Sequence, residues 1–439
     1  MSHVFPRHSK VMPPIADHGD GIYLIDTEGK KYLDGSGGAA VSCLGHSDPD
    51  VIQAVKTQVD KLAFAHTGFL SSAPAERLAD RLIAHAPDGI DRVYFVSGGS
   101  EAVESALKLS RQYMIETGQP KRTKFISRKQ SYHGNTLGAL GTGGNEWRRE
   151  PFSPVMVSAS HISPCYEYRL RKDGETQEDY GLRAANELEA ELLRQGPETV
   201  IAFLAEPVVG ATTGAVPAVP GYFKRIREIC DQYGILLILD EVMCGMGRTG
   251  TLFACEQDGV RPDLITIAKG LGAGYQPIGA MLCSAQIYEA IEHGSGFFQH
   301  GHTYVGHPVA CAAGDAVVKK LTDGGLVVRS AQMGEALMTA LTDAFGQHPH
   351  IGDIRGRGMF RGLEIVQDRE TKTPFDPDKR IAAKVKAAAM ANGLICYPMA
   401  GTIDGQRGDH VLLAPPFIIT EDQIGELVDK LSKSFAEVL

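Results

Sequence analysis

ILLILDEV at residues 235–242 and LITIAKG at residues 264–270 are the two stretches that decide the fold class. Both are nearly continuous runs of Ile and Leu, and they close on Asp240 and Lys269. A strand that is apolar at successive positions is covered on both faces, as the strands of parallel sheets are. We therefore expect two buried strands, each with a charged residue at its end.

Four further runs of this kind lie between about residues 90 and 320 and alternate with segments of helical periodicity. They are VYFV (93–96), KFIS (124–127), VIAFLAEPV (200–208) and IGAMLCS (278–284). Such alternation is typical of an open sheet whose strands are joined by helices. We predict an α/β fold with a mostly parallel, doubly wound sheet flanked by helices.

A second, smaller unit is indicated after residue 320, where a helix, the strand GMFRGLEIV (358–366), another helix and a short strand near 411–413 follow one another. At the other end of the chain, DGIYLIDTEGKKYLD (20–34) has the apolar runs and the turn of a hairpin. We predict that the N- and C-terminal segments together build this smaller α+β domain. The expected parts are residues 1–50 for the N-terminal segment, 51–320 for the large domain and 321–439 for the C-terminal segment.

The composition narrows the class of protein. Of the 439 residues, 43% are hydrophobic and 22% are charged, which is ordinary for a globular chain. The net charge of −9 gives no basic surface for nucleic acid or anionic lipid. The eight cysteines contain no C-x-x-C pair, which argues against zinc and against a disulfide framework. No apolar stretch approaches a membrane span, and the first residues lack the apolar core of a signal peptide, so a cytoplasmic protein is the default expectation.

Lys269 and Asp240 suggest a chemistry when they are taken together. A lysine that attacks a carbonyl must face a cleft with its charge kept low by burial, and a strand end is such a position. Protein sites for pyridoxal phosphate (PLP) pair a lysine that forms a Schiff base with an acid that anchors the pyridinium nitrogen of the ring. Asp240, at the end of another strand, could be that acid. A solvated lysine at a strand terminus is the ordinary interpretation of Lys269 alone.

An anion site is indicated by VYFVSGGSEAVESALKLSR (93–111), which has the pattern of a strand, a Gly-Gly-Ser turn and a helix. The N-terminus of that helix presents free N–H groups and the positive end of the helix dipole beside Gly98, Gly99 and Ser100. A phosphate could bind there. An ordinary tight turn with Ser100 as its N-cap is the alternative.

Three more residues occupy positions that suit a ligand. Tyr132, in SYHGNTLGA, could lie flat on an aromatic ring, and Glu206, in LAEPVVG, follows a strand toward the crevice where open α/β sheets bind ligands. Thr303, in HGHTYVGHP, offers a hydroxyl and a backbone N–H to an anion. Each has an ordinary loop role as its alternative. The two histidines beside Thr303 lack a third ligand at helical spacing, so no metal site is predicted.

Gly245, Gly247 and Gly250 match the letters G-x-G-x-x-G of a dinucleotide fingerprint. That motif requires its first glycine immediately after a strand and a helix that opens at the third. Here Asp-Glu-Val-Met-Cys intervenes, and TLFACEQDG is a poor start for a helix. A nicotinamide-dependent dehydrogenase is therefore a remote alternative.

Taken in order, these segments resemble the class III (ω-type) aminotransferases, which are PLP enzymes of fold type I. The resemblance rests on SGGSEAVESALKL, SYHG, AEPV, LDEVMCGMGRTG, IAKGLGAG, HTYVGHP and LAPPFIIT, and it spans almost the whole chain. It implies an enzyme that moves an amino group from an amine or (ω-)amino acid to a 2-oxo acid such as pyruvate, through a Lys269 aldimine and a pyridoxamine phosphate intermediate. It also implies a homodimer with active sites shared between subunits, or a tetramer built of dimers.

The resemblance also assigns roles to single residues. Lys269 would be the catalytic Schiff-base lysine and, once displaced by the substrate amine, a general base. Asp240 would be the partner of the pyridinium nitrogen. The other implied cofactor contacts are Val242 on one ring face, Tyr132 on the other, Gly99 and Ser100 at the phosphate, Thr303 at the phosphate of the neighbouring subunit, and Glu206 near the ring hydroxyl.

The sequence offers three candidates for substrate contacts. Arg407 could hold a substrate carboxylate by a bidentate pair, with a surface arginine as the alternative. Phe64 and Phe69 could shape the pocket, with core packing as their alternative. The arginine pattern of the acetylornithine and ornithine branches is not found in VSCLGHSDP, which favours a monoamine or ω-amino acid donor. The same fold and lysine also support racemases, aminomutases and a decarboxylating aminotransferase.

Overall fold

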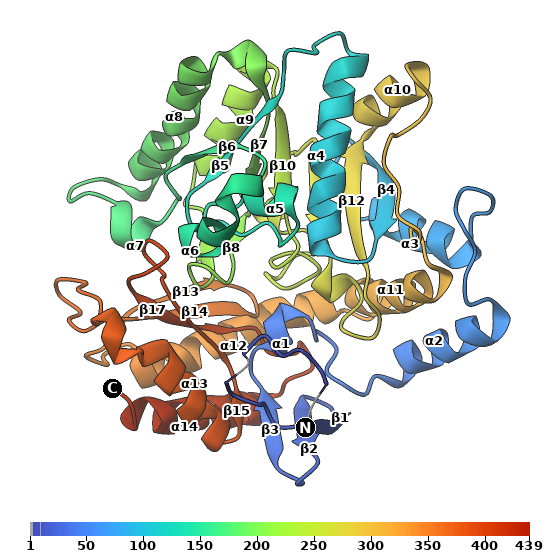
Figure 1. Cartoon of the computed structure of the whole chain (residues 1–439). Helices are drawn as coiled ribbons and strands as arrows, with labels where there is room; N and C mark the ends of the chain where they lie inside the picture. Colours follow the sequence, from blue (N-terminus) through green and yellow to red (C-terminus); the bar gives the residue numbers. More distant parts are fainter. Residues whose placement is uncertain (1–2, 9) are drawn as a thin grey trace.

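The computed structural model describes residues 3–8 and 10–439 and consists of two stacked parts. A large sheet with its helices forms the upper part of Figure 1, and smaller sheets with their helices form the lower part. The lower part is coloured blue, orange and red, so both ends of the chain contribute to it.

The large part is organised around one mixed sheet. In spatial order its strands are β4 (Ile90–Val96), β12 (Gly279–Ser284), β11 (Leu264–Ile267), β10 (Leu236–Asp240), β7 (Val200–Ala205), β5 (Lys124–Arg128) and β6 (Ala159–Ile162). β12 runs antiparallel to both of its neighbours, and the other neighbouring pairs are parallel. The predicted mostly parallel sheet is confirmed. The sequence did not indicate β6, whose residues ASHI include two polar ones.

Helices cover both faces of this sheet, which explains why its strands are apolar at successive positions. The covering helices include α4 (Gly99–Glu116) and α10 (Ala285–His293) on one face, and α8 (Gln177–Gln195) and α9 (Tyr222–Tyr233) on the other. In β10, Leu236 and Ile238 belong to the buried cluster of the first face, whereas Leu237 and Leu239 belong to that of the second. A strand with polar residues at alternate positions would leave one of these helix layers without an apolar surface to pack on.

The two ends of the chain pair directly in the smaller part. One sheet is β1 (Ala16–Asp20), β2 (Tyr23–Asp26), β3 (Lys31–Asp34) and β15 (Leu394–Ile395), and the other is β13 (Ile351–Arg357), β14 (Phe360–Ile365), β17 (Asp409–Leu413) and β16 (Tyr397–Ala400). Their helices are α12 (Leu326–Phe345), α13 (Ile381–Ala391) and α14 (Glu421–Ala436). Leu394 of β15 pairs in parallel with Leu33 of β3. The predicted smaller α+β unit built from both chain ends is confirmed, and its boundaries near residues 50 and 320 stay a prediction.

Shorter elements connect these layers. They are α1 (Gly37–Ala40), α2 (Pro49–Lys61), α3 (Ala73–Ile83), α5 (Leu137–Thr142), α6 (Glu146–Arg149), α7 (Glu167–Leu170), α11 (Pro308–Thr322), β8 (Val208–Val209) and β9 (Val216–Pro217). Five short 3-10 helices occur in the described residues: η1 (Glu150–Val155), η2 (Pro197–Thr199), η3 (Ala254–Asp258), η4 (Lys269–Leu271) and η5 (Pro377–Lys379).

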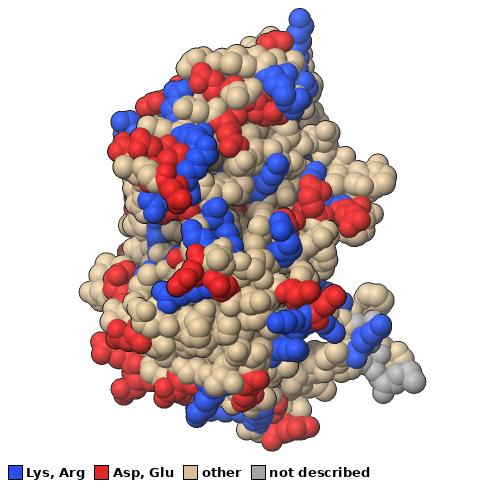
Figure 2. Space-filling view, turned by 90° about the vertical axis from the view of Figure 1, so that its left-hand side faces the viewer, with Lys and Arg blue, Asp and Glu red and all other residues tan. Residues whose placement is uncertain are grey.

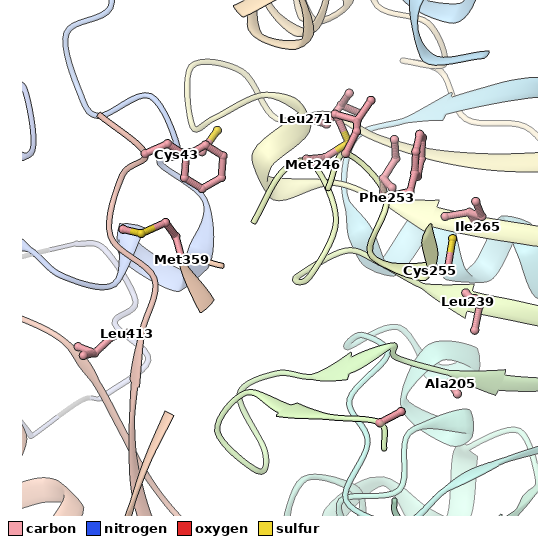
Figure 3. Packing of buried hydrophobic residues seen from close by; sticks show 14 of the residues in the cluster. Cys43, Ala205, Leu239, Met246, Phe253, Cys255, Ile265, Leu271, Met359 and Leu413 are labelled. Atoms are coloured by element: carbon pink, nitrogen blue, oxygen red, sulfur yellow. The ribbon is translucent and has the colours of Figure 1, made fainter. Parts of the chain in front are cut away.

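One hydrophobic core runs from the large sheet into the smaller part. Leu239 and Ile265, in the centre of the sheet, share a buried cluster with Phe253, Met359 and Leu413 (Figure 3). Because interiors of this kind are close-packed, the smaller part and the strand ends of the sheet are held in a fixed relation.

The surface carries charges of both signs. On the face shown in Figure 2, Lys and Arg side chains lie among Asp and Glu side chains and do not gather in one field. Across residues 3–8 and 10–439, no helix has both the length and the apolar content needed to cross a membrane.

Candidate active site

A cavity of about 520 Å³ lies where β10 and β11 end, and both Asp240 and Lys269 form part of its wall. Seven of the eight residues predicted to bind the cofactor line it, namely Lys269, Asp240, Val242, Tyr132, Gly99, Ser100 and Glu206. A larger cavity of about 700 Å³ lies elsewhere, between Tyr168 and Arg357, and none of the predicted site residues lines it. The carboxyl ends of the parallel strands therefore gather the predicted site in one place, as they do in open α/β sheets.

Lys269 begins the short turn η4 directly after β11. Its backbone φ is 45°, in the left-handed region that residues with a Cβ rarely adopt. Burial lowers the pKa of its amine to about 8, although the carboxylates of Asp240 and Glu206 oppose the shift. Roughly a tenth of the amine is therefore uncharged at pH 7, as a nucleophilic lysine requires.

Asp240 is buried and held by three hydrogen bonds. Its Oδ1 accepts from the hydroxyl of Thr266 at 3.1 Å and from the backbone N–H of Val242 at 3.0 Å. Its Oδ2 lies 2.8 Å from Nδ1 of His133. These contacts fix the carboxylate in the cavity wall with little freedom to rotate.

His133 is a site residue that the sequence did not reveal. The ring is buried, and its Nε2 has no hydrogen-bond partner among the residues that the structure describes. A carboxylate acceptor at Nδ1 places the proton on that nitrogen and leaves Nε2 as an acceptor in the neutral ring. The only signal was its place directly after Tyr132, in the motif SYHG.

The N-terminus of α4 forms another part of the cavity wall. Gly98 is the N-cap residue, and the helix begins at Gly99. The hydroxyl of Ser100 donates to Oδ1 of Asn135 at 2.8 Å and accepts from the backbone N–H of Asn135 at 3.0 Å. A Cβ on Gly99 would lie 2.6 Å from Cγ1 of Val242, so glycine is required for this close approach. The turn thus offers free N–H groups and a positive dipole end to an anion.

Glu206 is the second carboxyl group of the cavity. Burial, together with the nearby charge of Asp240, raises the pKa of Glu206 to about 8. Its Oε2 is buried without a partner in the described part of the chain. Near neutral pH, Glu206 is therefore mostly protonated and can donate a hydrogen bond to a group bound in the cavity.

Comparison with known proteins identifies the family. A model of the aminotransferase class-III family matches residues 4–435. The chain belongs to the class III aminotransferase family. It is 48% identical over 435 residues to an uncharacterised aminotransferase of Schizosaccharomyces pombe, a match that covers 99% of this chain and 94% of the relative.

Two solved structures of transaminases have the same fold. An (S)-enantioselective omega-transaminase from Thermomicrobium roseum matches with a TM-score of 0.93 and 36% identity, over 100% of this chain and 96% of that chain. The omega transaminase from Pseudomonas jessenii in complex with PMP matches with a TM-score of 0.93 and 33% identity, also over 100% and 96% of the two chains. The protein is therefore an aminotransferase, and PLP is the cofactor that its family implies.

Four predicted site residues of this aminotransferase lie outside the cavity. Thr303 is exposed on the loop between α10 and α11. Phe64 packs its ring against Tyr304 at 5.6 Å, and Phe69 is 87% exposed. Arg407 is exposed and forms an ion pair of 2.6 Å with Asp404. The roles of these residues in binding cofactor or substrate stay predictions.

Several residues of the cavity wall were not predicted as site residues. Besides His133, they include Val41, Ser97, Ala211, Met243 and Gln276. Val41 comes from the N-terminal segment and the others from loops that follow strands or turns. The course of these loops places the residues in the cavity wall, and the course of a loop cannot be predicted from the periodicity of the sequence.

The glycine motif of this aminotransferase is not a dinucleotide site. Gly245, Gly247 and Gly250 lie in the turn after β10, and Gly247 and Gly250 have φ values of 84° and 99°. No helix opens at Gly250 in the described chain, and the next element is the short η3. The dehydrogenase alternative therefore has no structural support.

We expect Gly99→Ala to weaken the binding of PLP about tenfold, because overpacking by one methyl group against Val242 costs about 1–3 kcal/mol. Titration of the cofactor-free protein with PLP, followed by absorbance, measures the change. Gly425→Ala is the matched control, since Gly425 is exposed on α14 and a Cβ there meets nothing within 4 Å. Equal affinities in the two variants would show that the close approach of Gly99 to Val242 does not shape the cofactor site.

Proposed function

We propose that this aminotransferase attaches PLP to Lys269 and moves an amino group from an amine or (ω-)amino acid donor to a 2-oxo acid such as pyruvate. The proposal rests on one observation: Lys269, whose pKa is lowered, and Asp240, which is buried and held by hydrogen bonds, line the same cavity. A lysine for covalent attachment and an acid for the ring nitrogen are what PLP chemistry needs from a protein. The P. jessenii transaminase, solved with PMP, supports the same choice of cofactor.

The shape and the polar atoms of the cavity fit PLP. The N-terminus of α4 at Gly99 and Ser100 suits its phosphate group. Val242 and Tyr132, which both line the cavity, would lie against the two faces of its ring. Glu206, with a buried oxygen that lacks a partner in the described chain, would lie near the ring hydroxyl. A polar ring bound in the cavity would give the unpaired carboxyl oxygen of Glu206 a hydrogen-bond partner.

When bound, PLP supplies a ring that withdraws electrons from the Cα atom of the substrate. Asp240 would accept a hydrogen bond from the ring nitrogen, and His133 would keep this carboxylate oriented. With its amine free, Lys269 would act as the general base that takes the proton from the Cα atom of the donor, and in the second half-reaction as the acid that returns a proton to the acceptor carbon. Its lowered pKa suits this work as a base near neutral pH.

We also propose that the active enzyme is a homodimer with shared active sites, and a tetramer built of two dimers is the alternative. Thr303 is exposed and lies outside the cavity of its own chain, as expected for a residue that completes the phosphate site of a partner. The neighbouring Tyr304 and its contact Phe64 are 59% and 38% exposed. Covering such apolar side chains favours association. A cytoplasmic location remains our expectation.

We expect the purified holoenzyme to lose the visible absorbance of its cofactor when a suitable donor amine is added without an acceptor, and to regain it with pyruvate. The amino group then rests on the cofactor between the two half-reactions. Donors are added one at a time and followed by absorbance. A cofactor band that no donor changes would contradict transamination and leave racemase or aminomutase chemistry on the same lysine.

We expect Lys269→Ala to bind PLP without covalent attachment and to have no measurable turnover, because both the attaching amine and the base are lost. Activity assays and mass spectrometry after borohydride reduction measure the two effects. Lys129→Ala, at an exposed position, is the control and should behave as wild type. Turnover in Lys269→Ala would falsify the assignment of this lysine.

We expect Asp240→Asn to retain PLP but to slow turnover by roughly 10- to 150-fold, which corresponds to a charge-assisted hydrogen bond of about 1.5–3 kcal/mol. Steady-state kinetics at saturating PLP measure the loss. Asp343→Asn, at an exposed position on α12, is the control. A near-normal rate in Asp240→Asn would mean that another group holds the ring nitrogen.

We expect the rate at which cofactor-free protein binds PLP covalently to rise with pH and to level off above about 8, since only the neutral amine of Lys269 attacks and its pKa is lowered to about 8. Stopped-flow absorbance at a series of pH values gives the profile. A rate that continues to climb toward the pKa of an ordinary lysine would contradict the effect of burial.

A further inference from the structure

Arg248 is a buried cation in the turn that follows β10, outside the wall of the active-site cavity. The residue is 2% exposed. Its Nη1 donates to the carbonyl of Pro415 at 2.6 Å and to that of Met359 at 3.4 Å. Its guanidinium carbon lies 4.5 Å from the ring centre of Phe417. These contacts fasten a turn of the large part to the loops that follow β13 and β17 in the smaller part.

The charge of Arg248 is not matched by a carboxylate. Within residues 3–8 and 10–439, no carboxylate forms an ion pair with it, and its buried Nη2 has no hydrogen-bond partner. Burial lowers the pKa of Arg248 to about 10, and the nearby groups of Cys43 and Asp34 oppose this shift. Asp34 itself lies 3.0 Å from Nε2 of His46. Because burying an unpaired guanidinium costs stability, packing alone does not account for an arginine at this position.

Residues 37–43 of the N-terminal segment contact both Arg248 and the turn η4, which carries the reactive lysine. A Cβ added to Gly37 would lie 3.6 Å from Nη2 of Arg248, so the backbone of the segment passes beside the guanidinium. Further along the segment, the thiol of Cys43 donates to the carbonyl of Gly270 in η4 at 3.6 Å. The segment therefore connects the buried cation to the backbone that carries the reactive amine.

The backbone of this segment is irregular and depends on its surroundings. Ala40 has a φ of 62°, a conformation that persists only where neighbouring packing determines it. Part of the support comes from the loop that Arg248 holds, because the backbone N–H of Phe417 donates to the carbonyl of Cys43 at 2.8 Å. Val41 belongs to the same segment and lines the active-site cavity. The contacts of Arg248 thus support one wall of the cavity as well as η4.

The charge of Arg248 also acts on the amine of Lys269. Burial is the main cause of the lowered pKa of this amine, and the charges of Asp240 and Glu206 oppose it. The guanidinium groups of Arg248 and, after it, Arg148 act in the same direction as burial. A positive charge beside an amine disfavours its protonated form. Arg248 therefore favours the uncharged lysine that the covalent attachment of PLP requires.

We propose that Arg248 is a positioning residue of the reaction, which fixes residues 37–43 against the Lys269 turn and keeps there a positive charge that favours the free amine. This inference rests on the proposed function, in which Lys269 attaches the cofactor. Arg248 acts through the segment and through its charge, since it does not line the cavity. Lysine at this position would keep the charge but lose the planar guanidinium that holds two carbonyls. Glutamine would keep a donor and lose the charge.

The test of the charge compares the covalent binding of PLP by cofactor-free Arg248→Gln, Arg248→Lys and wild type at a series of pH values. At pH 7 the rate should fall about threefold in Arg248→Gln, because loss of a nearby positive charge raises the pKa of Lys269 and leaves less free amine. The plateau of the rate should move to higher pH in this variant and stay in place in Arg248→Lys. Arg261→Gln, at an exposed position before β11, is the matched control and should keep the wild-type profile. An unchanged profile in Arg248→Gln, or an equal shift in Arg248→Lys, would overturn the inference.

The test of the positioning uses hydrogen–deuterium exchange of the Arg248→Lys holoenzyme, so it stands even if the neutral variant does not fold. Peptides that span residues 37–43 should exchange at least about threefold faster than in wild type, because the bidentate donor is lost. Peptides from β10 should exchange at the wild-type rate. Unchanged exchange over residues 37–43 would contradict a positioning role.

These measurements separate the inference from the proposed function. If PLP attaches to Lys269 with the expected dependence on Arg248 but no donor amine is converted, the inference stands and transamination fails. If donors are converted and the pH profile does not depend on Arg248, the inference fails alone.

Discussion

The site depends on the register between β10 and β11. Asp240 pairs with Thr266, and the hydroxyl of Thr266 donates to the Asp240 carboxylate at 3.1 Å. Three residues later the chain turns at Lys269, so the amine and the carboxylate meet at the same edge of the sheet. Since side chains alternate between faces, a slip of one residue would turn Asp240 to the opposite face and separate it from the lysine. The two apolar runs thus fix the geometry of the site by packing both faces of their strands.

The same burial that forms the cavity sets its chemistry. It lowers the pKa of Lys269 and raises that of Glu206, so that both groups carry less charge than they would in water. The backbone contributes strain as well: Met246 and Ala273 share the positive φ of Lys269, at 54° and 48°. Gly270, within the same turn, packs against Met246. Residues with a Cβ persist in such conformations only where the surrounding packing determines them, and here that packing is the continuous core.

Much of the fold could be predicted because continuous apolar runs report strands that are covered on both faces. The site residues at strand ends could be predicted for the same reason, since parallel strands bring their carboxyl ends together. His133 could not, because its role comes from a contact with Asp240, 107 residues away in the chain. The place of Arg148 could not either, because it comes from a contact with the ring of Tyr132 and not from a periodic pattern. Arg407 was predicted as a carboxylate-binding residue from its place before a short strand, but the structure pairs it with Asp404, three residues earlier in the same loop.

Arg148 and Arg407 lie on two elements that a chain of buried hydrogen bonds connects. Arg148 sits on α6, which is tied through Asn145 and Gln130 to the carbonyl of Gly401. Gly401 opens the loop that carries Arg407. Buried hydrogen bonds thus join the short helix beside Tyr132, a residue of the cavity wall, to the loop of the smaller part that carries Arg407.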